Sequence, residues 1–111
     1  MVMERGVRRG DVVLVSLGHG QGSEIRKTRP CLVVSPDVLN AHMPTFIVAP
    51  MTTGGHAYPF RVPYKFGGKS GFVVLDEIRT IDRARAVNRL GRVAPRSMDS
   101  VLRALQAMFA A

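Results

Sequence analysis

The segment from Gly20 to Pro36, GQGSEIRKTRPCLVVSP, changes abruptly from a polar, glycine-containing stretch to an apolar one. The glycines at its start permit backbone conformations closed to other residues, which suits a loop that wraps a ligand. Pro30 restricts Arg29 to extended geometry, directly before the expected strand from Cys31 to Ser35. We therefore expect Arg29 to be a positioned cation at the junction of a loop and a buried strand.

The loop before this strand carries one carboxylate among three cations: Glu24 with Arg26, Lys27 and Arg29. Such a group can bind a phosphate and transfer a proton beside it. A solvated, salt-bridged loop would have the same spacing. The residues alone leave both interpretations open.

The chain has 111 residues, of which 46% are hydrophobic, with 11 glycines and 7 prolines. This length and composition predict a single domain, residues 1–111, with short elements and tight turns, in the β-rich or α+β class. One cysteine excludes an internal disulfide, and Cys31 is expected to be a small buried hydrophobe. No stretch resembles a signal peptide or approaches membrane-spanning length, so we expect a cytoplasmic protein without membrane contact.

The sequence is strongly basic, with 16 Lys and Arg against 8 Asp and Glu and a formal net charge of +8. Arginine dominates the basic residues, and its planar donor fork matches phosphate oxygens and can stack on bases. This bias favours a nucleic-acid partner. An acidic protein partner and a generally basic surface are the alternatives.

The hydrophobic pattern predicts several short strands followed by one helix. Continuous apolar runs indicate strands covered on both faces, as in a closed or tightly curled small barrel. The C-terminal helix has apolar residues at helical spacing and a proline suited to its first turn. Asn40 and His42 are expected to be exposed in a turn, and residues 65–71 are expected to form a loop. The expected elements are strands at 11–17, 31–35, 45–49, 60–63 and 71–75 and a helix from about Pro95 to Phe109.

Two further segments offer candidate site residues. The run from Met51 to His56, MTTGGH, reads as a loop whose hydroxyls and free N–H groups could bind phosphate oxygens, or as a hydrogen-bonded turn. Asp76 and Glu77 follow the strand at 71–75, and on an extended chain they would point to opposite faces, which argues against a carboxylate dyad. The His, Cys, Asp and Glu spacings do not suggest a metal site.

Four blocks in order give the sequence a specific resemblance over nearly its whole length. They resemble the MazF/PemK/Kid family of bacterial toxin endoribonucleases, the toxin components of type II toxin-antitoxin systems. The blocks are RRGDVVLVSL (8–17), GSEIRKTRPCLVVSP (22–36), VAPMTT (48–53) and DEIRTID (76–82).

The resemblance implies a small SH3-like β-barrel with a C-terminal α-helix that works as a homodimer and is neutralised by an acidic antitoxin. It implies cleavage of single-stranded RNA, messenger RNA in particular, without a metal or other cofactor, and operator DNA contact only through the antitoxin complex. The implied catalytic residues are Arg29, Thr52 and Glu24. The substrate-binding candidates are Ser23, Lys27, Thr53, His56, Asp76 and Arg79, with His19 and His56 as reserve acids or bases.

The sequence departs from the family pattern at several positions. Val74 stands where the Kid-like branch has an arginine two residues before the aspartate, which is Asp76 here. Leu14 replaces a frequent aromatic, and Gly18-His19-Gly20 replaces an Asp-Pro pair before the glycine. Two alternative functions use the same barrel: a non-catalytic nucleic-acid-binding domain, and a protein-binding toxin similar to the gyrase poisons.

Overall fold

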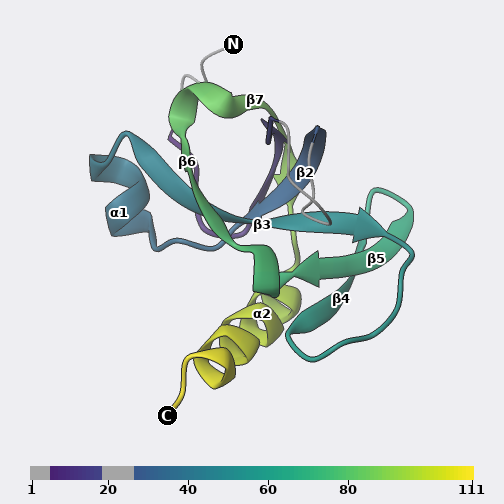
Figure 1. Cartoon of the computed structure of the whole chain (residues 1–111). Coiled ribbons are helices and arrows are strands. Elements are labelled where there is room, and N and C mark those ends of the chain that lie inside the picture. Colours follow the sequence, from purple (N-terminus) through teal and green to yellow (C-terminus); the bar gives the residue numbers. More distant parts are fainter. Residues whose placement is uncertain (1–5, 19–26) are drawn as a thin grey trace.

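The computed structural model describes residues 6–18 and 27–111, and within these ranges it is a β-rich α+β fold (Figure 1). The C-terminal helix α2 follows the last strand, as the sequence predicted. Among the described residues, neither helix is long and apolar enough to cross a membrane. The elements are β1 (Asp11–Ser16), β2 (Thr28–Val33), α1 (Asp37–His42), β3 (Thr45–Thr53), β4 (Arg61–Phe66), β5 (Lys69–Val74), η1 (Leu75–Glu77), β6 (Arg79–Asp82), η2 (Arg83–Arg85), β7 (Ala86–Arg92) and α2 (Pro95–Met108).

All described strand pairs are antiparallel, in the order β4-β5-β3-β2-β1-β7, with β6 paired to β3. The single turn η2 joins β6 to β7, although these strands pair with β3 and β1. Strands β6, β3, β2, β1 and β7 must therefore curl until the two outer strands approach each other. Figure 1 shows them around a ring, the barrel-like arrangement that the apolar runs predicted.

Strand β3 changes its partner halfway along one edge. Residues 45–48 pair with β6, whereas Met51–Thr53 pair with β5. Pro50 lies between these two ladders, where a residue without an N–H is tolerated. The expected strand end at Pro50 was therefore wrong, and Thr52 and Thr53 belong to a strand rather than to a loop.

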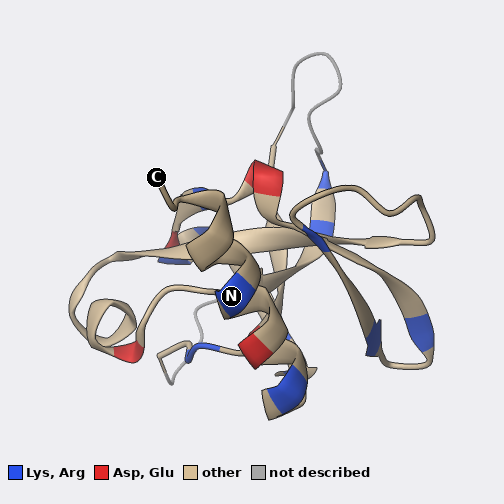
Figure 2. Cartoon of the chain, turned by 90° about the horizontal axis from the view of Figure 1, so that it is seen from below, with Lys and Arg blue, Asp and Glu red and all other residues tan. Residues whose placement is uncertain are grey.

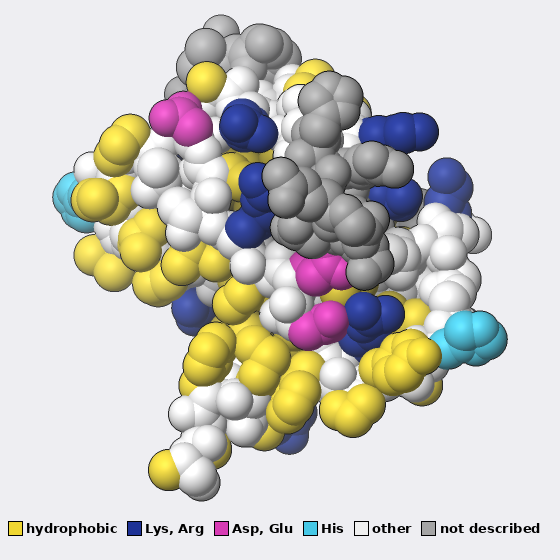
Figure 3. Space-filling view, viewed as in Figure 1, with side chains coloured by type: hydrophobic (Ala, Val, Ile, Leu, Met, Phe, Trp, Pro, Cys, Tyr) yellow, Lys and Arg dark blue, Asp and Glu magenta, His cyan; other side chains and the backbone are white. Residues whose placement is uncertain are grey.

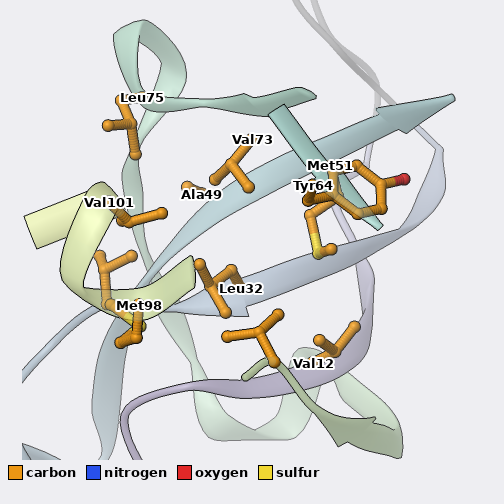
Figure 4. Packing of buried hydrophobic residues seen from close by; sticks show 11 residues of the cluster. Val12, Leu32, Ala49, Met51, Tyr64, Val73, Leu75, Met98 and Val101 are labelled. Carbon is orange, nitrogen blue, oxygen red and sulfur yellow. The ribbon is translucent and has the colours of Figure 1, made fainter. Parts of the chain in front are cut away.

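The central strands bury side chains on both faces, as their continuous apolarity predicted. Cys31 and Val33 of β2 enter one cluster, inside the curled strands, while Leu32 between them enters the other. This outer cluster lies against α2, through Met98 and Val101 (Figure 4). The inner cluster contains Val7, Val13, Val15, Leu17, Cys31, Val33, Phe46, Val48, Ile81 and Ala86. The outer cluster contains Val12, Leu32, Val34, Ala49, Met51, Tyr64, Val73, Leu75, Val93, Met98 and Val101.

The β4–β5 hairpin is longer than the sequence suggested. The expected loop at 65–71 is reduced to Gly67 and Gly68, whose φ angles of 58° and 76° fit a two-residue turn between twisted strands. Both strands therefore continue up to this turn. Phe66, beside the turn, lies against β7: a Cβ on Gly91 would come within 2.9 Å of the Phe66 ring. The hairpin thus folds over onto the far edge strand.

The short helix α1 is anchored by a buried polar network. Ser35 Oγ donates to Asn40 Oδ1 at 2.5 Å, Asn40 Nδ2 donates to the Ser35 carbonyl at 3.0 Å, and Ile47 N–H donates to Ser35 Oγ at 2.9 Å. Asn40 is fully buried, so the expected exposure of this residue was wrong. Its burial is possible because its side-chain amide forms hydrogen bonds with the hydroxyl and the carbonyl of Ser35. His42 is exposed, as expected.

Strand β7 was missed in the sequence because most of its residues are polar or exposed. It is held to β1 partly by Asp11, which is buried and lies 3.2 Å from Arg89 Nε and 3.1 Å from Arg92 Nη2. The predicted start of α2 at Pro95 is confirmed, whereas Phe109 lies beyond the helix and is 72% exposed.

Asn40→Ala should lower the free energy of unfolding by about 1–3 kcal/mol, because Ser35 would lose its buried partners. Urea denaturation followed by circular dichroism measures this difference. Asn88→Ala, on the exposed part of β7, is the matched control and should change stability by less than about 0.5 kcal/mol. Equal stability of the two variants would contradict a structural role for the network.

Candidate active site

Arg29 lies in the first part of β2, opposite Val15 of β1. Strands alternate their faces, so Arg29 shares its face with Cys31 and Val33, which belong to the inner cluster. Its side chain is half-buried, and its Nε atom is buried with no hydrogen-bond acceptor among the described residues. A buried donor without an acceptor is costly, and an oxygen brought by a ligand would satisfy it. The expected positioned cation is therefore in place, inside the strand rather than just before it.

Thr52 lies on the neighbouring strand β3 and faces the same side of the sheet. The β2–β3 ladder ends at the pair Cys31–Pro50, and Arg29 and Thr52 each stand two residues further along their strands. Thr52 is half-buried, and its Oγ1 makes a long contact of 3.4 Å to the Phe72 carbonyl. The hydroxyl is therefore held beside the strand, and it can exchange this long contact for a hydrogen bond donated to a ligand oxygen.

Arg79 adds a second cation at this end of the inner cluster. It pairs with Val48 across the β3–β6 ladder and shares the face of that residue. Burial raises the pKa of the Cys31 thiol to about 12, and the positive charges of Arg79 and Arg29 lower it in part. Both guanidinium groups thus lie close enough to act on the same thiol. Cys31 stays protonated at neutral pH, so it is a buried hydrophobe, as predicted, and not a nucleophile.

Asp76 and Glu77 lie in the 3₁₀ turn η1, so the expected extended geometry with opposite faces was wrong. Asp76 accepts two hydrogen bonds from Arg61, at 3.1 Å from Nε and 3.0 Å from Nη2. These bonds lower the pKa of Asp76 and raise that of Arg61, which the negative charge of Glu77 raises further. The two oxygens of Asp76 are thus directed at an arginine from strand β4.

The other residues predicted for the site do not all lie beside Arg29 and Thr52. Lys27 is exposed and takes a left-handed backbone with φ of 72°; its N–H donates to the Gly18 carbonyl at 2.9 Å. Thr53 and His56 are exposed at and after the end of β3. Glu24 and Ser23, like His19, lie outside the described residues. The structure therefore brings Arg29, Thr52 and Arg79 to one end of the inner cluster, with Asp76 on the adjoining turn η1.

Arg61 was missed in the sequence because it stands at the start of a strand with no motif around it. It lies opposite Val74 in the β4–β5 ladder, two residues before Asp76. A correct hairpin register would have found it, since only pairing brings residues 61 and 76 together. Basic residues are spread over most elements of the chain (Figure 2), and position 61 differs from most of them by its paired carboxylate.

Gly71 controls the position of Thr52. Strands β5 and β3 approach so closely that a Cβ on Gly71 would lie 1.7 Å from the Thr52 carbonyl oxygen and 2.7 Å from its carbonyl carbon. These are backbone atoms paired in a ladder, and they cannot move aside without separating the strands. The placement of the threonine thus depends on a residue 19 positions away.

The fold and these side chains define a class: a small barrel-like β protein with a C-terminal helix, and a half-buried arginine beside a strand threonine at one end of the barrel. Residues 8–109 match the family of PemK-like, MazF-like toxins of type II toxin-antitoxin systems, and the chain belongs to this family. The family resemblance of the four sequence blocks is thereby confirmed.

Individual relatives agree with this assignment. The chain is 35% identical over 106 residues to Endoribonuclease MazF of Staphylococcus epidermidis, an alignment that covers 89% of this chain and 88% of the relative. The crystal structure of MazF from Deinococcus radiodurans matches with a TM-score of 0.82 at 27% identity, over 95% of this chain and 97% of the other. A mycobacterial endoribonuclease in complex with its cognate antitoxin matches with a TM-score of 0.77 at 27% identity, over 91% and 92% of the two chains.

Gly71→Ala should destabilise the protein by about 1–3 kcal/mol or more, because the added methyl group forces β5 away from β3. Urea denaturation measures the change. Ser70→Ala, at an exposed neighbouring position, serves as the control and should leave the midpoint almost unchanged. An unchanged midpoint for Gly71→Ala would show that the strands separate at no cost, and that Gly71 does not fix Thr52.

Proposed function

We propose that this toxin is a metal-independent endoribonuclease that cuts single-stranded RNA by attack of the RNA's own 2′-hydroxyl on the adjacent phosphorus. The observation that carries the proposal is the half-buried Arg29, whose Nε has no acceptor among the described residues, on the same face as Thr52. The relative at 35% identity is named an endoribonuclease, which supports the reaction class.

The proposed reaction divides into three tasks. The 2′-oxygen forms a bond to phosphorus and loses its proton, the phosphoryl oxygens take up negative charge, and the bond from phosphorus to the 5′-oxygen breaks as that oxygen gains a proton. Arg29 and Thr52 suit the second task, because a guanidinium and a hydroxyl held on neighbouring strands form a preorganised pair of donors. The products are a 2′,3′-cyclic phosphate and a 5′-hydroxyl.

Glu24 is proposed to move a proton or to orient Arg29. Arg79 and Lys27 add positive charge around the scissile phosphate, and Ser23, Thr53 and His56 contact neighbouring nucleotides. Asp76 acts indirectly in this proposal, since both of its oxygens accept hydrogen bonds from Arg61.

The proposed partners follow from the family and from the charge. Type II toxins are neutralised by an antitoxin, and the structures of relatives include an endoribonuclease with its cognate antitoxin. A chain of net charge +8 fits an acidic antitoxin segment that covers the basic surface. We further propose that the protein works as a cytoplasmic homodimer and meets operator DNA only through the antitoxin complex. The alternatives, a non-catalytic nucleic-acid-binding domain and a gyrase-poison-like domain, have no comparable support among the relatives.

Cleavage of a long single-stranded RNA should continue in EDTA, because attack by a 2′-hydroxyl needs no metal-activated water. Replacing the 2′-hydroxyl at the cut nucleotide with hydrogen should stop it. End mapping and phosphatase treatment of the products identify the cyclic phosphate and the 5′-hydroxyl. Full inhibition by EDTA, or rapid cutting of the deoxy substrate, would refute the mechanism.

Arg29→Ala should reduce the single-turnover rate by a factor on the order of 10² to 10³, the usual effect of losing one preorganised donor. Stability should change little, since no described residue accepts a hydrogen bond from Arg29 Nε. Arg29→Lys should restore RNA binding more than turnover, because lysine retains the charge and loses the planar fork.

Arg103→Ala, an exposed position on α2, is the control for loss of positive charge. Melting temperatures measured in parallel separate catalysis from folding. A well-folded Arg29→Ala protein with wild-type turnover would remove Arg29 from the site.

A further inference from the structure

Tyr58 is a large aromatic side chain left on the surface, 59% exposed, in the segment between β3 and β4. The guanidinium carbon of Arg61 lies 5.1 Å from the centre of its ring. Phe60, two residues along, is 37% exposed. Two exposed aromatic rings next to an arginine offer a ligand both flat apolar surface and a positive charge. The arrangement is suited to stacking.

The turn that carries Tyr58 is fixed at several points. Arg61 N–H donates to the Tyr58 carbonyl at 3.1 Å, and Leu75 N–H donates to the Phe60 carbonyl at 3.1 Å. Phe60 itself takes a left-handed φ of 64°, a conformation that costs free energy in a residue with a side chain. The bidentate pair with Asp76 then holds the guanidinium group over the ring. The aromatic ring is therefore ordered before any ligand binds.

Charged side chains lead from Tyr58 toward Arg29 in a row. Arg61 lies over the Tyr58 ring and pairs with Asp76, which stands next to Glu77 in turn η1, and β6 begins two residues later at Arg79. Arg79 and Arg29 in turn both act on the thiol of Cys31. Figure 3 shows acidic, basic and hydrophobic side chains next to one another on the face of the molecule that it displays. A strand of RNA with one phosphate at Arg29 could follow this row.

We propose that Tyr58, held by Arg61 and Asp76, is a stacking platform for one unpaired base of the RNA, on a nucleotide near the scissile phosphate. This inference rests on the proposed function. Arg61 covers one face of the ring and leaves exposed ring surface for the base. Every base has a face that can stack on an aromatic ring, and such stacking contributes about 1–3 kcal/mol per base. The bound arginine adds positive charge close to the neighbouring phosphate.

Tyrosine fluorescence tests this directly, because the chain has no tryptophan and two tyrosines, Tyr58 and the buried Tyr64. The probe is a single-stranded 2′-fluoro oligonucleotide of mixed sequence, which lacks the attacking 2′-hydroxyl. Binding should quench the emission of the wild-type protein and of Tyr64→Phe. The emission of Tyr58→Phe, which then comes from Tyr64 alone, should not change beyond the absorbance correction.

Affinity supplies the second readout, measured by fluorescence anisotropy of a labelled probe. Tyr58→Ala should weaken binding about 5- to 100-fold, the equivalent of one lost stacking contact. Tyr58→Phe should bind like the wild type, because phenylalanine stacks equally well. Arg61→Leu should bind more weakly than wild type, because it frees the ring and removes the charge. At RNA concentrations below the dissociation constant, the single-turnover cleavage rate of Tyr58→Ala should fall by about the same factor as its affinity, because the ring contributes to RNA binding.

The outcomes separate this inference from the proposed function. If the protein cuts RNA while the probe leaves the emission unchanged and Tyr58→Ala binds like wild type, the platform is overturned and the endoribonuclease stands. If the probe quenches Tyr58 while no RNA is cut, the platform is supported and the proposed reaction fails. The quenching measurement on the wild-type protein does not depend on the folding of any variant.

Discussion

The structure depends on the close approach of β5 to β3 at Gly71, where a single methyl group would meet the Thr52 backbone at 1.7 Å. Strand β3 pairs with β2 along one edge and passes from β6 to β5 along the other. This change of partner joins the curled sheet to the hairpin. It also extends β3 beyond Pro50, so that Thr52 stands on a rigid strand next to Arg29. Glycine at position 71 is what allows a hydroxyl to be held there.

The same strands separate two apolar clusters, and the proposed site lies where the inner one ends. Arg29 and Arg79 are half-buried and lie close enough to buried Cys31 for their charges to lower the pKa of its thiol in part. With Nε of Arg29 lacking an acceptor among the described residues, an anionic ligand offers the missing partner. Buried polar groups such as those of Asn40 find their hydrogen-bond partners within the fold. Arg29 Nε differs, because its acceptor would be the phosphate of the proposed RNA substrate.

The ion pair of Arg61 and Asp76 bears on one departure from the family pattern, the replacement of an arginine by Val74. The Kid-like branch has an arginine at the position of Val74, and here Arg61 lies opposite Val74 on the adjacent strand and reaches Asp76. A guanidinium beside this carboxylate is therefore present, supplied by a different strand. Because it comes from β4, it is also bound to the turn that carries Tyr58, which connects the acidic turn η1 to an exposed aromatic ring.

Features that depend on neighbouring residues could be predicted from the amino-acid sequence. The apolar runs at 11–17, 31–35 and 45–49 located the buried parts of β1, β2 and β3, although β2 spans Thr28–Val33 and β3 continues to Thr53. The helical spacing located α2, and Pro30 held Arg29 extended next to buried Cys31. These features follow from local backbone restriction and from side-chain periodicity, which act over a few residues. The four family blocks added the fold and the reaction class.

Features that depend on strand pairing could be read only from the folded chain. The tertiary structure placed the polar strand β7 through the ion pairs of Asp11, carried β3 past Pro50, and buried Asn40, which the sequence had suggested was exposed. It also joined Arg61 to Asp76, and set Gly71 against Thr52. Apart from Asn40, which is buried through its bonds to nearby Ser35, the deciding contacts join residues that lie far apart in the chain, so no local pattern encodes them, and the register of the sheet has to be known first.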